Sequence, residues 1–328
     1  MTDGAREGKA LALTPPTRPR IDKALLLRFG PFLGLAVIAL VLSLLSPSFL
    51  TTSNVLNVAR QVSINAIIAA GMTLVMIAGG FDLSVGSIMS LSGVLGIMAM
   101  NRFGDGAGAL LTVLVGAACG LVNGTLVAYC RINSFVATLV GMTVFHGIAL
   151  VVTDSFPVER SEGWYRVLGQ GHLAGIPVPI YLTAVVFLLL HLTLTRTTFG
   201  TSVYAVGGNE EAARLSGIDV ARVRLTVFTL CGACAALATL ILVGRISSAQ
   251  ANMGMGAEID AISAVVIGGT SLAGGEGSAL GSLVGAFTIG FIYNGLNLLN
   301  ISPHYQLVAK GLVIAAAVIL DRQLVHRR

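Results

Sequence analysis

Charged residues are scarce in this chain of 328 residues. Asp, Glu, Lys and Arg make up 11% of it, and 55% is hydrophobic. Soluble domains usually carry about 25% charged residues. The shortage excludes an ordinary soluble domain and indicates an all-α polytopic membrane protein, because helices satisfy their own backbone hydrogen bonds in a lipid bilayer. The 40 glycines fit this fold, since small residues let neighbouring helices approach closely.

The sequence also lacks the patterns of a catalytic or nucleotide-binding site. No G-K-[ST] triplet accompanies its glycine-rich runs, so there is no Walker loop. The five histidines are scattered, and no Ser/His/Asp grouping or metal-spaced cluster is visible. We therefore expect a protein that is not an enzyme, holds no cofactor or metal, and takes its energy from another subunit.

Neither the cysteines nor the net charge of +5 indicates further chemistry. The only C-x-x-C has no second pair and no nearby histidine, so we interpret the cysteines as small packing residues. The basic residues are not interleaved with aromatics, which argues against nucleic acid binding. The four cysteines are Cys119, Cys130, Cys231 and Cys234.

Ten apolar runs are long enough, or nearly so, to cross a bilayer whose hydrocarbon core is about 30 Å thick. The eighth run is short, so we expect it to be tilted, broken or extended by its neighbours. Residues 1–28 are predicted to form a basic cytoplasmic tail, and residues 29–328 a single transmembrane domain. The predicted spans are residues 31–50, 55–78, 84–100, 107–129, 134–153, 177–195, 225–244, 259–272, 278–298 and 304–320.

The positions of the basic residues orient these spans. With a cytoplasmic N-terminus, fourteen of the twenty Lys and Arg residues fall inside and five fall outside, while Lys310 lies within the last span. Such an excess on the cytoplasmic side is the bias expected of membrane proteins. Ten spans then place both termini in the cytoplasm.

A polar island interrupts the apolar runs at residues 196–224. It carries seven charged residues, whereas the runs at 177–195 and 225–244 carry none. The island must lie in water, because charges are costly in hydrocarbon. It is either a plain solvated loop or a docking element for a cytosolic partner.

A short helix is predicted inside the island. Asn209 suits the N-cap, and the carboxylates of Glu210 and Glu211 favour the positive helix end. Glu210 and Arg214 stand four apart and can pair, and Gly217 suits the left-handed position after the last turn. A small apolar face is left by Ala212, Ala213, Leu215 and Ile218.

Two glycine-rich interruptions, at residues 79–87 and 268–278, separate apolar runs. The first is either a tight cytoplasmic turn, with Asp82 or Ser84 capping the next helix, or a re-entrant element beside a transport path. A weak sequence similarity between the two interruptions indicates a parallel internal repeat, a common feature of transporters.

Uncharged polar residues within the spans are candidates for a solute path. Amide and hydroxyl groups suit an uncharged, polyhydroxylated solute, although they also hold helices together in membranes. Two of the asparagines lie three apart on one predicted helix and so share a face. The candidate path residues are Asn65, Asn123, Asn294 and Asn297.

The longest segment predicted outside is residues 154–176. It is either a connecting loop or the resting place of a soluble binding protein. Trp164 and Tyr165 suit an interfacial anchor or a contact surface.

Three blocks of this sequence resemble ribose-type sugar permeases, the membrane subunits of ATP-binding-cassette (ABC) importers in the branched-chain amino acid/ribose permease superfamily. The blocks are GGNEEAARLSGIDVARVR at 207–224, MIAGGFDLSVGSIMS at 76–90, and GAEIDAISAVVIGGTSLAGGEGSALG at 256–281, followed by YNGLNLL. The resemblance covers about residues 54–321. Its signature positions here are Gly80, Asp82, Ser84, Gly86, Asp260, Gly268, Gly269, Gly274 and Gly275.

The resemblance implies a multi-pass subunit of the bacterial cytoplasmic membrane that imports a monosaccharide or a related small polyol. Two copies of the permease would form the path, an ABC ATPase would dock on the 196–224 loop, and a periplasmic or lipid-tethered sugar-binding protein would deliver the solute. The implied ATPase contacts are Asn209, Glu210, Glu211, Arg214, Leu215 and Gly217.

Three other functions are alternatives to a sugar permease. A branched-chain amino acid permease belongs to the same superfamily, but the blocks DLSVG and RLSGI favour the sugar branch. An ion-coupled secondary carrier would need acidic or cation-binding residues within its spans, and these spans carry almost none. A membrane scaffold without transport activity would leave the two glycine-rich interruptions unexplained.

The orientation of the island can be tested by labelling. A cysteine introduced by Ala212→Cys should react with a membrane-impermeant thiol reagent only after the cytoplasmic face is opened, because the island is predicted to lie inside. The unsubstituted protein, treated in parallel, measures the reaction of the native cysteines. Labelling of intact cells specifically at position 212 would contradict the predicted topology.

Overall fold

The computed structural model describes residues 23–302, 304–308, 311–312 and 315. Most of the predicted tenth span and the basic residues up to position 22 lie outside this part of the chain. The first helix begins at Lys23 and contains Pro31. The predicted boundary between tail and membrane domain, at residue 28, therefore falls inside this helix and stays a prediction.

Most of the described residues lie in helices. They are α1 (Lys23–Leu45), α2 (Thr52–Ile77), α3 (Val85–Phe103), α4 (Asp105–Ala128), α5 (Ser134–Thr153), α6 (Arg166–Gln170), α7 (Val178–Arg196), α8 (Thr198–Gly208), α9 (Glu210–Leu215), α10 (Val220–Ile246), α11 (Ala257–Ile267) and α12 (Ala279–Leu298). The strands have two residues each: β1 (Val158–Glu159), β2 (His172–Leu173), β3 (Ile176–Pro177) and β4 (Ser248–Ala249). The predicted all-α class is confirmed.

Within the described residues, six helices are long and apolar enough to cross a membrane: α2, α4, α5, α7, α10 and α12. They correspond to six of the ten predicted spans. The predicted spans at 84–100 and 259–272 coincide with helices α3 and α11, which do not meet that standard. The structure therefore supports a polytopic helical protein and leaves the count of ten as a prediction.

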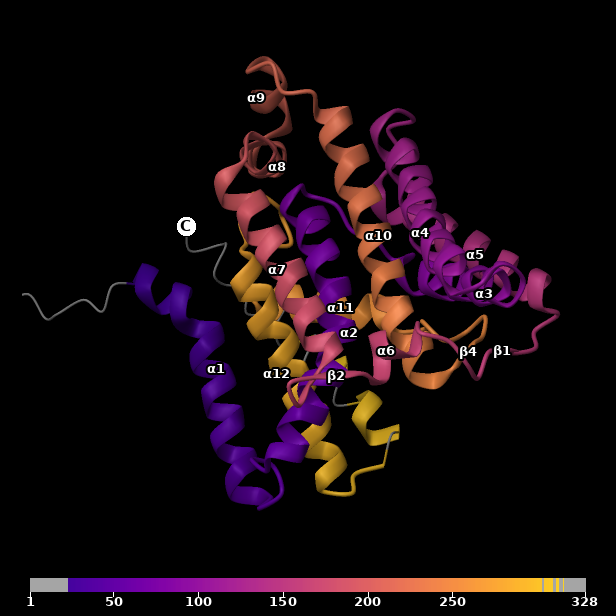
Figure 1. The fold of residues 1–328 in the computed structure, drawn as a ribbon. Helices are drawn as coiled ribbons and strands as arrows, with labels where there is room; N and C mark the ends of the chain where they lie inside the picture. The colour runs from indigo at the N-terminus through magenta and orange to yellow at the C-terminus, as the bar shows by residue number, and fades with distance from the viewer. Residues whose placement is uncertain (1–22, 303, 309–310, 313–314, 316–328) are drawn as a thin grey trace, which may run out of the picture.

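The centre of the molecule is formed by α2 and α10, around which the other long helices stand (Figure 1). Most residues of both helices are buried, whereas α4, α5 and α7 bury only a minority of theirs. Figure 1 places α8 and α9 at one end of the bundle, called the α9 end below, and the short strands near the opposite end. The outer helices therefore keep broad apolar surfaces free for lipid or another subunit.

Glycines allow the closest helix contacts, as the composition predicts. A Cβ atom on Gly120 of α4 would lie 2.3 Å from the carbonyl oxygen of Phe228 on α10. A Cβ on Gly232 of α10 would lie 2.2 Å from the carbonyl oxygen of Gly116. No larger residue fits these positions without separating the helices, so the α4–α10 contact depends on them.

At the opposite end, β1 pairs with β4 and joins the segment before α6 to the end of α10. Arg160 anchors the same segment through a 2.5 Å ion pair with the carboxylate of Asp105. Tyr165 is fully buried and its hydroxyl donates to the carbonyl oxygen of Arg160. The predicted contact role of Tyr165 was therefore wrong, because packing took its ring inside, while the neighbouring Trp164 is exposed.

The predicted short span is a half-length helix. Helix α11 has 11 residues and so extends ~16 Å, about half the hydrocarbon thickness. Its first turn follows Gly254, whose carbonyl oxygen would lie 2.4 Å from a Cβ on Gly86 at the start of α3. The N-terminal ends of α3 and α11 thus meet inside the bundle, and the chain enters and leaves this region without regular structure.

The glycine contact between α4 and α10 gives a stability prediction. Gly120→Ala should lower the free energy of unfolding by about 1–3 kcal/mol, because the added methyl forces two backbones apart. Gly147→Ala is the matched control, since a Cβ there meets nothing within 4 Å. It should leave stability unchanged or slightly higher. Thermal unfolding of the two purified variants in one detergent checks this, and equal melting temperatures would contradict it.

Candidate functional site

The predicted helix of the polar island exists as α9. The Asn209 side chain accepts a hydrogen bond from the Ala212 backbone N–H at 2.9 Å, so the predicted N-cap is confirmed. Gly217 has a φ of +84°, which confirms its left-handed conformation. Glu211 and Leu215 project into solvent, and the Leu215 side chain is 83% exposed. This outer face of α9 is therefore open to contact with another molecule.

The apolar face predicted for α9 is divided. Ala213 is buried, and Ile218 packs against the hydrophobic core. Ala212 and Leu215 instead face outward. One side of α9 is therefore fixed to the bundle while the other is free for a partner.

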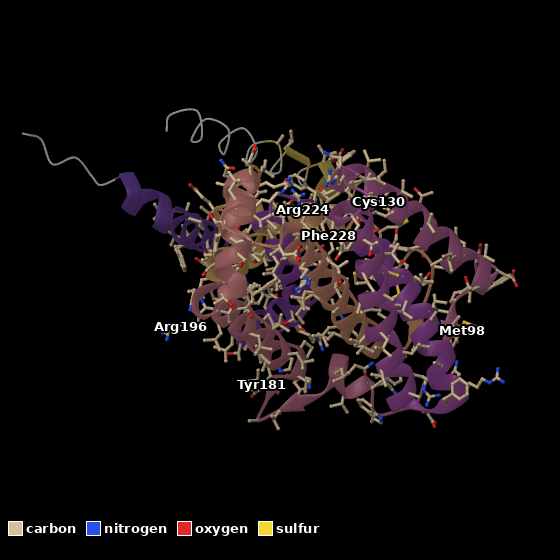
Figure 2. The ribbon with its side chains drawn as sticks, turned by 90° about the horizontal axis from the view of Figure 1, so that it is seen from above. Met98, Cys130, Tyr181, Arg196, Arg224 and Phe228 are labelled. Atoms are coloured by element: carbon tan, nitrogen blue, oxygen red, sulfur yellow. The ribbon has the colours of Figure 1, made fainter. Side chains whose placement is uncertain are left out.

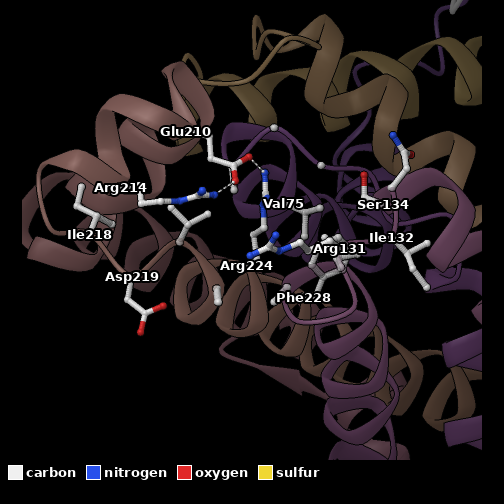
Figure 3. A pocket seen from close by; sticks show the side chains of 18 residues that line it. Val75, Arg131, Ile132, Ser134, Glu210, Arg214, Ile218, Asp219, Arg224 and Phe228 are labelled. Atoms are coloured by element: carbon white, nitrogen blue, oxygen red, sulfur yellow. Dashed lines mark hydrogen bonds and ion pairs between the residues drawn. The ribbon is translucent and has the colours of Figure 1, made fainter.

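Glu210 connects α9 to the long helix α10. Its carboxylate receives Arg214 at 2.7 Å, which confirms the predicted pair, and also Arg224 of α10 at 2.6 Å (Figure 3). Glu210 and Arg224 are both partly shielded from water, so this bond is stronger than a fully exposed ion pair. The Glu210–Arg224 ion pair thus links α9 directly to α10.

Seen from the α9 end, Arg224 and Phe228 lie near the middle of the bundle, and Arg196 lies at its edge (Figure 2). The α9 end is hollowed there by a cavity of about 600 Å³. The residues that line it come from the end of α2, the α4–α5 turn, α9 and the start of α10 (Figure 3). The charged residues of its lining are Arg131, Glu210, Arg214, Asp219 and Arg224.

The second glycine-rich interruption, residues 268–278, packs against α8 and the end of α2. The N–H of Gly275 donates to the carbonyl oxygen of Ile77 at 2.8 Å. The Tyr204 hydroxyl of α8 donates to the carbonyl oxygen of Gly277 at 2.8 Å. Burial raises the pKa of this phenol above its usual range.

Several glycines of this interruption are required by the backbone. Gly269, Gly274 and Gly275 have φ values of +86°, +87° and +74°, which disfavour any residue with a side chain. A Cβ on Gly274 would also lie 2.8 Å from the Cα of Gly79. The two interruptions predicted from sequence are thus in direct contact below α8.

The first interruption leads to a buried polar cluster of Asp82, Ser84 and Asn123. One oxygen of the fully buried Asp82 accepts from the Ser84 N–H at 2.9 Å and from its hydroxyl at 2.6 Å. The Asn123 amide donates to the Ser84 hydroxyl at 2.7 Å. Ser84 is the N-cap residue of α3, but neither side chain makes the predicted capping bond. The carboxylate instead fixes the irregular backbone just ahead of the helix.

The remaining signature residues serve close packing. A Cβ on Gly80 would lie 3.3 Å from the Val75 side chain, and one on Gly268 would lie 2.4 Å from the Gly281 backbone. Asp260 of α11 accepts a hydrogen bond from the Tyr293 hydroxyl of α12 at 3.0 Å.

The four candidate path residues are not brought together. Asn123 belongs to the buried cluster, whereas Asn294 exchanges amide hydrogen bonds of 2.9 Å with Asn54 near the opposite end. Asn297 accepts from Gln306 at 2.8 Å, and Asn65 is half-buried in α2. Asn294 and Asn297 therefore make the interhelical and loop contacts weighed as the alternative, and a role in the path remains a prediction for all four.

Comparisons with known proteins agree with the resemblance found in the sequence. The family described as "Branched-chain amino acid transport system / permease component" matches residues 54–318. The chain is 46% identical to the ribose import permease protein RbsC of Bacillus subtilis, over 90% of this chain and 93% of that protein. It is 44% identical to RbsC of Escherichia coli K12 (93% and 97% covered) and 38% identical to its L-arabinose transport system permease protein AraH (90% and 90%). No solved structure matches the chain.

The polar cluster gives a second stability prediction. Asp82→Ala should lower the free energy of unfolding by about 1–3 kcal/mol, because two buried Ser84 donors lose their acceptor. Asp82→Asn keeps the accepting oxygen and should retain most of the stability. Glu162→Ala, at an exposed carboxylate, is the control. Thermal unfolding decides, and an alanine variant as stable as the unsubstituted protein would show that the cluster is not structural.

Proposed function

Because this chain belongs to the family of branched-chain amino acid transport system permease components, we propose that it is the membrane-spanning subunit of a bacterial importer for a monosaccharide or related small polyol. The proposal places it in the cytoplasmic membrane with the α9 end inside. Its long apolar helices and its relatives among permeases support that location.

The relatives favour a sugar over a branched-chain amino acid. Those with 38–46% identity are named as permeases for ribose, D-allose or L-arabinose. The description of the family names amino acids, but the block RLSGI that supports the sugar branch covers the end of α9 and the turn that follows it. Neutral amides and hydroxyls in the interior suit a neutral polyol.

A separate ATP-hydrolysing subunit is proposed to drive transport by docking on α9. The observation that carries this proposal is the shared Glu210 carboxylate. It holds α9 to α10 through Arg224, while the opposite face of α9, with Leu215, stays exposed. A partner that grips α9 and moves on ATP binding would therefore shift α10, around which the bundle is built.

A second connection from the docking region runs through α8. Tyr204 holds the 268–278 interruption, and this interruption holds the end of α2 through Gly275 and Ile77. Movement of α8 and α9 would thus reach the two irregular segments where α2 and α11 end. Irregular backbone is the part of a membrane helix bundle that changes conformation with the least loss of hydrogen bonds.

A soluble sugar-binding protein is proposed to rest on the opposite end. The exposed Trp164 lies there, on a segment anchored by Arg160 and by the β1–β4 pair. Strand β4 continues into the chain that descends to Gly254 and α11. Binding at this surface would therefore act on the interior of the bundle.

A second copy of the chain is proposed to complete the path. Helices α4, α5 and α7 expose many large apolar side chains along their length. Lipid covers part of this surface, and the remainder is available to the partner permease.

The proposed function is tested by reconstituting the chain in vesicles with its ATP-hydrolysing subunit and a sugar-binding protein. Uptake of labelled ribose against a gradient should require ATP hydrolysis and should persist when an uncoupler collapses the proton gradient. Uptake that survives loss of ATP but not of the proton gradient would favour an ion-coupled carrier instead.

The docking role of α9 is tested by the double variant Glu211→Ala/Arg214→Ala. It should insert and fold normally, because both residues are exposed, but uptake should be uncoupled from ATP hydrolysis. Glu162→Ala at the opposite end is the matched control. The measurement is sugar taken up per ATP hydrolysed, and a normal ratio in the double variant would count against α9 as the coupling element.

A further inference from the structure

A positive charge in the cavity at the α9 end has no counter-charge among the described residues. Arg131, in the turn between α4 and α5, lines the cavity and makes no ion pair there. The nearby carboxylates are already engaged. Glu210 holds Arg214 and Arg224, and Asp219 holds Arg222 at 2.8 Å.

The backbone of Arg131 is in an unfavourable conformation. Its φ is +55°, in the left-handed region that helix ends usually fill with glycine. The turn is closed by a hydrogen bond of 3.1 Å from the Ile132 N–H to the carbonyl oxygen of Leu126. An arginine in this place costs about 1 kcal/mol relative to glycine. The turn nevertheless carries Arg131, which lines the cavity without an ion-pair partner among the described residues.

The cavity is large enough for more than a dissolved ion. Its volume of about 600 Å³ is within the range of sites that receive a drug-sized group or the tip of an inserted segment. One wall contains Glu210 and Arg214 of α9, and the opposite wall is the turn that carries Arg131 (Figure 3). A partner that covers α9 must therefore also cover this opening.

We propose that the cavity receives an acidic side chain of the ATP-hydrolysing partner, which pairs with Arg131 while the partner grips α9. This inference rests on the proposed function and adds a second contact outside the docking helix. Charge complementarity carries it, because the guanidinium offers a carboxylate two parallel hydrogen bonds and the resident carboxylates are occupied.

The position of the contact gives it a mechanical consequence. The cavity floor includes Gly79 and Gly80, the start of the irregular segment that leads to Asp82, and Phe228 of α10. An acidic group drawn in or withdrawn during the ATP cycle would thus act beside the end of α2. The partner would then hold the two sides of the cavity, α9 and the α4–α5 turn, at a distance set by its own conformation.

The experiment measures binding of the purified ATP-hydrolysing subunit to the chain in lipid nanodiscs. Arg131→Glu should weaken binding about tenfold, as expected for the loss of a charge-assisted hydrogen bond. Arg131→Gln, which adds no repulsion, should weaken it less, and Arg131→Lys should retain most of it. Arg102→Glu, at the end of α3 far from α9, is the control and should bind normally.

The possible outcomes separate this inference from the proposed function. Normal binding by Arg131→Glu and Arg131→Gln, with uncoupled transport in Glu211→Ala/Arg214→Ala, would overturn the cavity contact and leave docking on α9 intact. Normal behaviour of all these variants would overturn both. A lipid phosphate is the other source of negative charge, and nanodiscs with and without anionic lipid test it. If Arg131→Glu weakened binding of the ATP-hydrolysing subunit only in nanodiscs with anionic lipid, the cavity would be assigned to a lipid phosphate and the proposal would be overturned.

Discussion

The ion bridge centred on Glu210 is the interaction on which the proposed mechanism depends. One carboxylate joins a six-residue helix, too short to be stable alone, to the longest helix of the bundle. Without Arg224, α9 would be held mainly by the buried Ala213 and by α8. Its movement would then be absorbed by the surrounding surface loop and would not be passed on to α10. With it, a force on the polar island reaches the centre of the protein.

The force is useful only because the bundle transmits it. Helices α4 and α10 touch backbone to backbone at Gly116, Gly120 and Gly232, which makes them a closely packed pair. In contrast, the two glycine-rich interruptions lie outside the regular helices and pack against each other and against α8. A rigid pair of helices beside an irregular, deformable layer is an arrangement that can open and close a path.

Local chemistry explains which features were predictable. The N-cap of Asn209, the pair of Glu210 with Arg214, and the left-handed Gly217 each depend on residues within a few positions of one another, and all three are confirmed. The bonds from Glu210 to Arg224, fourteen residues away, and from Tyr204 to Gly277 obey no spacing rule and were missed. Tyr165 was misassigned because exposure depends on the neighbours that the fold supplies.

The sequence alone determined that this protein lies in a membrane, that it is helical, and where its one large polar island falls. These features follow from hydrophobicity and charge, which are properties of each residue. It also marked the two glycine-rich interruptions. Only the tertiary structure decided that these interruptions touch, that Asp82 supports Ser84 instead of capping α3, and that Asn294 pairs with Asn54. Such pairings are set by how helices distant in sequence pack together, and no local pattern encodes them.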